Sequence, residues 1–485
     1  MNQSTQFSTP PPPPSSQSKW WAMLGVGLGI LMFTLDTSIV NIALPTLVQE
    51  FRTSFAVVQW IVLSYLLVVT ALVLGAARLG DMWGKKRLYL GGLMAFTLSS
   101  LLCGLAPSVE WLIGFRALQG LGAVFISALG AAIVTEVFPP AERGKALGII
   151  GAVVSLGIAL GPTVGGLLIA IAGWRLIFLV NVPIGIFATF IVLRFIPSSA
   201  KNPIQQRFDA IGALLATAVL TCFALGMTYG QDHGFSNPIT LALLVATAIG
   251  LAVFFIVESR LVQPMLDLQL FRDLQFSLSL LMAWLVFIVI AGVIFILPFF
   301  LELVKHYPTQ QVGLLLAVSP VLGGIIAPFS GSLSDRFGPR IISLIGLVLM
   351  VGGCCAISTV DSQLTQLGYI LRIAPFGIGL GMFQSPNNSA ILGSVPRERL
   401  GIASGLMSLS RTLGQTTGLP LLGAIFAALT ISSAHLAAHS NVTTAPAEAL
   451  VNGVQGTFRI AAVILLVATV LTGIVWRMER VSRRG

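Results

Sequence analysis

Asp36 is an acidic residue inside the apolar stretch LDTSIVNIALP (35–45). The apolar segment around it runs from about residue 21 to residue 45, and the part before Asp36 is too short to cross a membrane alone. A charged carboxylate within the hydrocarbon costs roughly 3 kcal/mol on insertion scales, so burial favours its taking up a proton. Asp36 is therefore predicted to carry protons, and it is a candidate counter-charge for a cationic substrate. The alternative is a structural hydrogen bond to a neighbouring helix.

Three arginines, Arg116, Arg372 and Arg411, also lie within apolar segments. The helices that carry Asp36 and Arg116 are predicted to run in opposite directions, which brings both side chains to a similar depth. A guanidinium stabilises a nearby carboxylate, so Arg116 is predicted to tune Asp36 in proton coupling. Hydrogen bonds to backbone carbonyls alone are the alternative. Arg411 would hold either an anionic substrate or a backbone carbonyl of another helix. We favour the second, structural role.

The elements that must position these residues are membrane-spanning helices. Of the 485 residues, 56% are hydrophobic and 9% are charged, with a mean hydropathy of +0.94, whereas soluble domains carry roughly 25% charged residues. The apolar residues form about fourteen blocks of the length that crosses a ~30 Å hydrocarbon layer as a helix. We therefore predict an all-α polytopic membrane protein and not a β-barrel, whose strands would alternate.

Lysine and arginine gather in alternate loops, such as residues 85–87, and after the last apolar block. Short loops rich in these residues face the cytoplasm, so a multi-pass protein of the plasma (inner) membrane with both termini cytoplasmic is predicted. This topology explains the net charge of +10 without nucleic-acid binding. The proline-rich residues 1–19 lack signal-peptide features and are predicted to form a disordered tail, the alternative being a partner-binding polyproline segment. The cysteine pattern predicts neither disulfides nor a metal site.

The sequence contains an internal repeat. RLGDMWGKKR (78–87) is echoed by SLSDRFGPR (332–340), with Asp81 matching Asp335 (335 − 81 = 254) and Gly84 matching Gly338. Arg116 is echoed by Arg372 at nearly the same offset (372 − 116 = 256). Two six-helix bundles are therefore predicted at 20–200 and 261–480, with a two-helix insert at 201–260 and a short tail at 481–485. Duplicated helical halves are the architecture of transporters that carry substrate at a midplane site.

At these residues the chain resembles the major facilitator superfamily, and within it the fourteen-spanner drug:proton antiporters of the multidrug efflux type. RLGDMWGKKR resembles the signature of the loop between the second and third helices, with Ala77 in place of its first glycine. GIALGPTVGG (157–166) resembles the fifth-helix antiporter signature, LDTSIVNIALP the first-helix signature, and RTLGQTTG from Arg411 the eleventh-helix pattern. The resemblance implies the fold of that superfamily, with two pseudo-symmetric bundles and two extra helices.

Two of these motifs predict moving or closely packed parts. Small residues recur every four positions in the fifth helix, which lets helix backbones approach closely, and a proline adds a local bend. This pattern is compatible both with ordinary helix packing and with a dry, hinge-like contact between helices. The resemblance also implies a cytoplasmic gate in which Asp81 pairs across the two halves, the alternative being a loop that only sets topology. These gating and motif residues are Asp81, Gly84, Arg87, Asp335, Gly338, Gly157, Gly161, Pro162, Gly165 and Gly166.

Aromatic and amide side chains on several helices are predicted to form the wall of a substrate cavity, because such surfaces suit bulky, partly apolar compounds. Each residue alone could instead serve packing. The predicted substrate-binding residues are Asp36, Asn41, Trp60, Tyr65, Gln119, Phe383, Gln384, Asn387 and Arg411.

The predicted function is proton-coupled export of lipophilic, cationic or neutral compounds by alternating access, with no cofactor and no enzymatic step. No GxxxxGK[ST] nucleotide-binding motif occurs in the sequence, which favours a gradient-driven carrier. The expected partners are the lipophilic substrate, protons and membrane lipid, with a monomer as the working unit. The alternatives are a carrier for a specific native metabolite or lipid, and a non-transporting membrane sensor or enzyme.

Overall fold

The computed structural model describes residues 16–53, 55–139, 142–196, 209–261, 268–395, 400–434 and 445–482, and these residues are helical or in short connections. The first half contains α1 (Ser16–Glu50), α2 (Phe55–Trp83), α3 (Lys85–Gly104), α4 (Val109–Val137), α5 (Arg143–Ala172), α6 (Leu176–Leu179) and α7 (Asn181–Phe195). Two helices follow, α8 (Ala210–His233) and α9 (Pro238–Arg260). The second half contains the 3₁₀ turn η2 (Leu268–Arg272), α10 (Leu274–Phe299), the π-helical turn η3 (Phe300–Val304), α11 (Thr309–Phe337), α12 (Pro339–Ile357), α13 (Gln366–Gly393), α14 (Leu400–Ser433) and α15 (Ala447–Ser482).

The described helices match the predicted membrane class. Twelve of them are long and apolar enough to cross a membrane, and α5, bent by 41°, would be a thirteenth. The described side chains of α2 add a shorter apolar helix, Val57–Val73, so the expected number of about fourteen spans is roughly matched. Pro162 explains the bend, because proline cannot donate the helical hydrogen bond and its ring clashes with the preceding turn.

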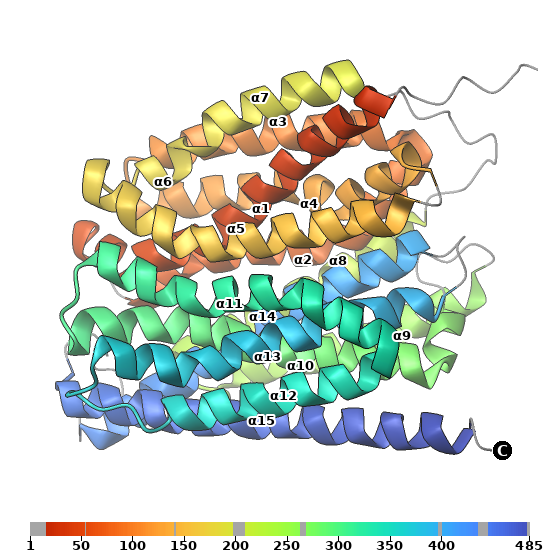
Figure 1. Cartoon of the computed structure of the whole chain (residues 1–485). Coiled ribbons are helices and arrows are strands. Elements are labelled where there is room, and N and C mark those ends of the chain that lie inside the picture. Colours follow the sequence, from red (N-terminus) through yellow and green to blue (C-terminus); the bar gives the residue numbers. More distant parts are fainter. Residues whose placement is uncertain are drawn as a thin grey trace, which may run out of the picture.

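The long helices lie nearly parallel to one another, and the first half of the chain lies above the second half in the view of Figure 1. The first described turn of α1 and the end of α15 lie at the same end of the bundle (Figure 1). Residues 16–19, which the sequence placed in the tail, form part of α1, while residues 1–15 lie outside the described part of the chain. The halves meet mainly where α5 packs on α11 and where α2 packs on α14.

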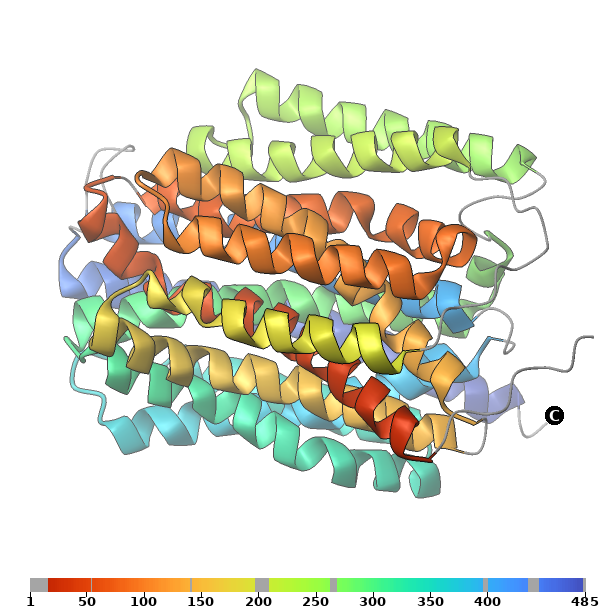
Figure 2. The same ribbon diagram turned by 90° about the horizontal axis from the view of Figure 1, so that it is seen from above.

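The inserted helices α8 and α9 lie along one edge of the molecule (Figure 2). They pack on each other, and α8 also contacts α2 and α14, one helix from each half. Thr217 of α8 donates a hydrogen bond to the Ala71 carbonyl of α2 at 3.2 Å. Only 11% of the apolar window of α9 is buried, so α9 presents most of its surface to the surroundings.

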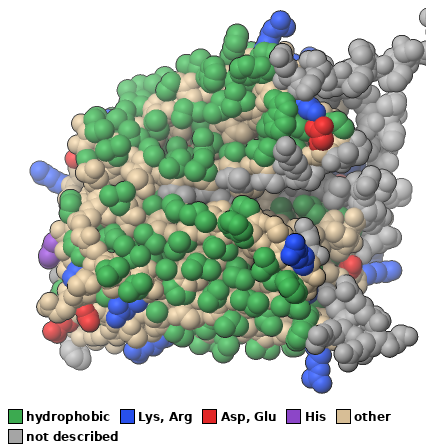
Figure 3. All heavy atoms as spheres, viewed as in Figure 1, with side chains coloured by type: hydrophobic (Ala, Val, Ile, Leu, Met, Phe, Trp, Pro, Cys, Tyr) green, Lys and Arg blue, Asp and Glu red, His purple; other side chains and the backbone are tan. Residues whose placement is uncertain are grey.

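The outside of the bundle is apolar. Figure 3 shows hydrophobic side chains spread over the lateral face and charged ones near its ends. Leu214 is 72% exposed, and Ile171 and Phe190 are more than half exposed. A soluble protein rarely exposes so continuous an apolar surface, whereas lipid tails solvate it readily, so the face shown is suited to the hydrocarbon layer.

Candidate functional site

Asp36 is completely buried, with 0% of its surface exposed. One carboxylate oxygen accepts a hydrogen bond from Nη1 of Arg116 at 2.5 Å. The other accepts from the amide nitrogens of Gln119 at 3.0 Å and Asn181 at 3.1 Å. The expected proximity of Asp36 and Arg116 is thus seen as a direct ion pair, formed because α1 and α4 pack together in the first half.

Arg116 is held on several sides. Its Nε donates to the carbonyl of Ile61 on α2 at 3.0 Å, and its Nη1 also donates to Oε1 of Gln119 at 2.5 Å. The guanidinium carbon lies 4.2 Å from the centre of the Tyr65 ring, a cation–π contact. Arg116 thus pairs with the carboxylate and also binds a backbone carbonyl, and its tuning of Asp36 in proton coupling stays a prediction.

Asn181 is a member of this cluster that the sequence reasoning missed. It is fully buried at the first residue of α7, directly after the short helix α6. Its signal was a lone amide in the apolar run LIFLVNVPIG, where the residues on both sides of it are apolar. A buried amide needs hydrogen-bond partners, and the nearest available acceptor is the carboxylate on α1.

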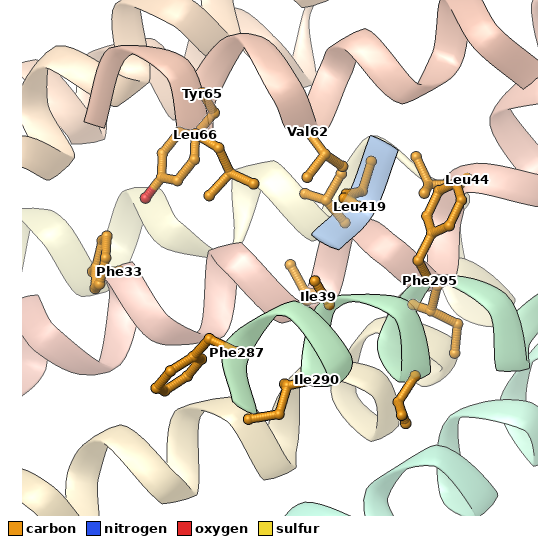
Figure 4. Close-up of a cluster of buried hydrophobic side chains, with 14 of the residues drawn as sticks. Phe33, Ile39, Leu44, Val62, Tyr65, Leu66, Phe287, Ile290, Phe295 and Leu419 are labelled. Carbon is orange, nitrogen blue, oxygen red and sulfur yellow. The ribbon is translucent and has the colours of Figure 1, made fainter. Parts of the chain in front are cut away.

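A cavity lies between the two halves, with about 800 Å³ of space not filled by protein atoms. Helices α1, α2 and α5 supply one wall, and α10, α11, α13 and α14 supply the other. Figure 4 shows part of the apolar surroundings, with Val62 and Leu66 of α2 on one side and Phe287 and Ile290 of α10 on the other. The residues that line it are Thr34, Thr37, Ser38, Asn41, Val62, Leu66, Ile158, Phe287, Ile290, Ala291, Ile294, Pro320, Gly323, Gly324, Leu380, Gly381, Gln384, Gln415 and Leu419.

Asp36 does not line this cavity, although four of its neighbours on α1 do. Successive residues of a helix are rotated by about 100°, so Thr34, Thr37, Ser38 and Asn41 share one face, and Asp36 points about 150° away from it. Helix α1 therefore separates two environments. One face lines the cavity between the halves, and the opposite face carries the carboxylate into the interior of the first half.

The duplicated bundles and the central cavity point to a family of carriers. The model of the Major Facilitator Superfamily matches residues 26–419, with a second match over residues 279–485. The chain belongs to the Major Facilitator Superfamily. Its resemblance to the drug-efflux branch is confirmed by its relatives.

Two curated relatives are similar over most of their length. The multidrug resistance protein Stp of Mycobacterium tuberculosis is 36% identical over 407 residues, which cover 84% of this chain and 75% of Stp. The riboflavin transporter RibZ of Clostridioides difficile is 36% identical over 419 residues, covering 84% of this chain and 88% of RibZ. Among solved structures, a bacterial homologue of the lysosomal transporter Spinster, in an inward-facing and unoccupied conformation, superposes with a TM-score of 0.67 at 17% identity, covering 96% of this chain and 98% of that one. That likeness supports the fold.

The residues predicted to form the substrate wall divide into three groups. Asn41 and Gln384 line the cavity, and Arg411 is half-buried behind it, with its guanidinium 6.0 Å from the ring centre of Phe287. The remaining predicted wall residues are absent from the lining: Asp36, Tyr65 and Gln119 belong to the carboxylate cluster of the first half, Trp60 is half-buried, and Phe383 and Asn387 are buried within the second half. Asn387 donates to the carbonyl of Ser279 on α10 at 3.2 Å. These predicted wall residues miss the cavity because of how each helix is rotated about its axis. The boundaries of the spans alone do not determine that rotation.

The glycines of α5 lie on one face, as their spacing predicts. A Cβ atom added to Gly161 would lie 2.7 Å from the Cβ of Ser38 on α1, and Gly157 and Gly165 are similarly close to that helix. A Cβ on Gly166 would instead lie 2.8 Å from the Thr309 carbonyl of α11. Helix α5 is thus packed between α1 of its own half and α11 of the other half, and it links the two.

The repeated loop motifs also keep their geometry. Gly84 and Gly338 have φ angles of 96° and 89° at the start of α3 and α12, which glycine adopts without strain. Arg87 is exposed. The side chains of Asp81 and Asp335 lie outside the described residues, so the proposed gate stays a prediction.

The lysines of the first loop motif bind within the first half. Lys85 pairs with Glu136 at the end of α4, and Lys86 donates to the Leu193 carbonyl at 3.0 Å and to that of Ile196. Cations near helix C-termini are stabilised by the free carbonyls. These contacts give the lysines a structural role besides the topological one that the sequence predicts.

Proposed function

We propose that the chain is a proton-coupled secondary transporter that exports lipophilic compounds, with Asp36 as the group that binds and releases the proton. The observation that carries the proposal is the buried carboxylate on α1, a helix whose opposite face lines the cavity between the two halves. The proposal includes a working monomer in the plasma (inner) membrane, both termini in the cytoplasm, the proton gradient as the driving force, and no enzymatic step.

The coupling follows from the contacts of Asp36. The charged carboxylate accepts three hydrogen bonds and balances the charge of Arg116. A proton on Asp36 removes that balance, because a neutral carboxyl attracts a guanidinium less and offers fewer acceptor sites. Arg116 then relies on Gln119, the Ile61 carbonyl and the Tyr65 ring. Loosening of this cluster frees α1 to move against α4 and α7.

Movement of α1 reaches the substrate by two routes. Its other face carries the cavity residues Thr34, Thr37, Ser38 and Asn41, and its backbone packs against the glycines of α5. Since α5 packs in turn on α11, the protonation state of Asp36 biases how the two halves meet. Proton binding and substrate binding then favour different arrangements of the halves, which is the requirement for antiport.

The test uses purified protein in liposomes that contain a pH-sensitive dye. A proton gradient is imposed and a lipophilic substrate panel, including ethidium and riboflavin, is added to wild type, to Asp36→Asn and to Asp361→Asn. Asp361 lies in an exposed connection between α12 and α13 and receives the same chemical change far from the cluster. Substrate-triggered proton movement is expected in wild type and Asp361→Asn and absent in Asp36→Asn. Equal movement in all three would place the proton site elsewhere.

A carrier for one native metabolite is the second candidate. Its support is the relative RibZ, a riboflavin transporter that is 36% identical to this chain. Competition separates the two functions. A broad exporter moves chemically unrelated compounds that compete with one another, whereas a dedicated carrier moves one compound class and ignores the rest.

A further inference from the structure

Within the part of the chain that the structure describes, no acidic residue lines the cavity. Among the described residues that surround it, the polar ones are hydroxyls and amides, and none is Asp, Glu, Lys or Arg. Asp36 is fully buried on the other side of α1, where its oxygens already accept three hydrogen bonds. A cation in this cavity would therefore have no carboxylate to pair with, and burying an unpaired charge is costly.

A positive charge lies beside a residue of the cavity wall in the second half. The guanidinium of Arg411 lies 6.0 Å from the ring centre of Phe287, which lines the cavity. Arg411 stands one helical turn before Gln415, another lining residue, so the two share a face of α14. This positive charge disfavours a cationic ligand, and the Gln415 amide that lines the cavity can donate to a carbonyl or phenolate oxygen.

The first half offers mainly acceptors. The hydroxyls of Thr34 and Thr37 donate to backbone carbonyls of their own helix, at 2.9 Å and 2.7 Å, and the Asn41 amide donates to the Thr37 carbonyl at 2.8 Å. Their remaining lone pairs are suited to hydroxyl or N–H groups of a ligand. A ligand with donors along one edge and carbonyl or anionic oxygens along the other fits between α1 and α14.

The shape of the wall adds a constraint. Gly323 and Gly324 of α11 and Gly381 of α13 line the cavity beside Pro320 and Leu380. A Cβ built on Gly323 would lie 3.2 Å from the Gly377 carbonyl of α13, so these helices meet closely through small residues. Glycine leaves a smooth backbone surface without protruding side chains, and such a surface is suited to the face of a flat ring system.

We propose that proton and substrate occupy separate sites on opposite faces of α1, and that the cavity takes a flat aromatic compound that is uncharged or anionic. A lipophilic cation is disfavoured. The inference rests on the proposed export function and narrows its substrate from cationic or neutral compounds. It also makes coupling indirect, because the substrate never contacts the carboxylate that carries the proton.

The experiment compares three planar tricyclic fluorophores of similar size that differ in charge: resorufin (an anion), lumiflavin (neutral) and proflavine (a cation). Binding to the full-length protein in lipid nanodiscs is followed by fluorescence anisotropy at pH 7.5. Resorufin and lumiflavin are expected to bind at least tenfold more tightly than proflavine. This ranking is measured on wild type and needs no variant.

Two variants test the separate roles. Arg411→Met is expected to weaken resorufin at least fivefold and lumiflavin less than threefold, while Arg411→Lys, which keeps the charge, retains the preference for resorufin. Asp36→Asn, which mimics the protonated carboxyl, is expected to shift the Kd values of all three probes by a common factor and so to keep their ranking, because none of them contacts the carboxylate. Size-exclusion profiles establish that each variant is folded. If a variant does not fold, the ranking of the three probes on the wild-type protein still tests the proposal.

The inference is overturned if proflavine binds most tightly, if none of the three probes binds saturably, or if Asp36→Asn changes the ranking of the three probes. Failure of the export function would look different. In that case the probes would bind with the expected ranking, but lumiflavin would trigger no proton movement in wild-type liposomes. Conversely, proton movement driven by proflavine alone would keep the transporter and refute the assigned substrate class.

Discussion

Replacing both members of the Asp36–Arg116 pair should be far less damaging than replacing one. Breaking a buried ion pair by removing one partner typically destabilises by about 3–5 kcal/mol, because the other charge is left uncompensated, whereas removing both can be nearly neutral. Here both side chains are at most 1% exposed, so the full penalty applies. Arg116→Met and Asp36→Asn are each expected to lower the unfolding free energy by about 3 kcal/mol.

The double variant Asp36→Asn/Arg116→Met is expected to lie within about 1 kcal/mol of wild type, since neither charge remains buried. The double-mutant cycle then gives a coupling of about 5 kcal/mol, well above the few tenths that independent sites show. Equilibrium unfolding in SDS mixed micelles measures the three differences, and thermal melting gives the same ranking. All three variants are expected to lose proton-coupled flux.

Two outcomes would refute this reasoning. If the losses of the single variants simply add in the double variant, the two charges do not stabilise each other in the membrane. If Arg116→Met keeps wild-type flux and stability, Asp36 does not depend on the guanidinium, and the other two donors to its carboxylate suffice.

Three further changes test other contacts. Asn181→Leu removes one donor to Asp36 at 3.1 Å, so we expect the free energy of unfolding to fall by about 1–3 kcal/mol. Antiport in liposomes should become slower without being abolished. Unchanged flux and stability would show that this hydrogen bond does not matter. Gly161→Ala places a Cβ 2.7 Å from the Cβ of Ser38 on α1, so it should destabilise the fold by about 1–3 kcal/mol and slow transport. The control Gly151→Ala, on the same helix, meets nothing within 4 Å and should change neither stability nor transport. Gly338→Ala forces a side chain to adopt a φ of 89°, which should cost about 1–2 kcal/mol; an unchanged melting temperature would contradict the strain.

The fold and the pairing of charges followed from the sequence because each has a simple one-dimensional signal. The loop motifs around Gly84 and Gly338 recur in the same order, and this repetition predicts two bundles. Asp36 and Arg116 were matched by their depth in antiparallel helices, and depth can be counted along a chain. The glycine face of α5 was equally accessible, because a four-residue spacing fixes the face of a helix.

The cavity wall was harder to predict because it depends on helix rotation. A residue such as Phe383 lies at a suitable depth, but whether it faces the cavity or the interior of its own half depends on packing against α12 and α10. Gln119 shows the same problem, since its amide turns toward Asp36 and Ser100 and away from the cavity. Asn181 escaped attention because a single amide in an apolar run gives no sign of the carboxylate that it binds.

The two halves repeat the fold but not the chemistry. At the offset of 256, the position of Asp36 is taken by Gly292 (36 + 256 = 292), which packs against Leu422 of α14. Arg372, the counterpart of Arg116, is only half-buried and donates to Thr359 and to the Gly368 carbonyl. Within the described residues, the buried ion pair thus belongs to the first half alone.

The second half contributes the amides of Gln384 and Gln415 to the cavity instead. A carrier in which one half senses the proton and the other holds the ligand needs a part that both can move. Helix α1 meets this requirement, because Asp36 fixes one of its faces within the first half while Ser38 and Asn41 on the other face complete the cavity. In the mechanism proposed above, the α1–α5–α11 contact converts a change at the carboxylate into a change between the halves, so that substrate and proton need not compete for the same atoms.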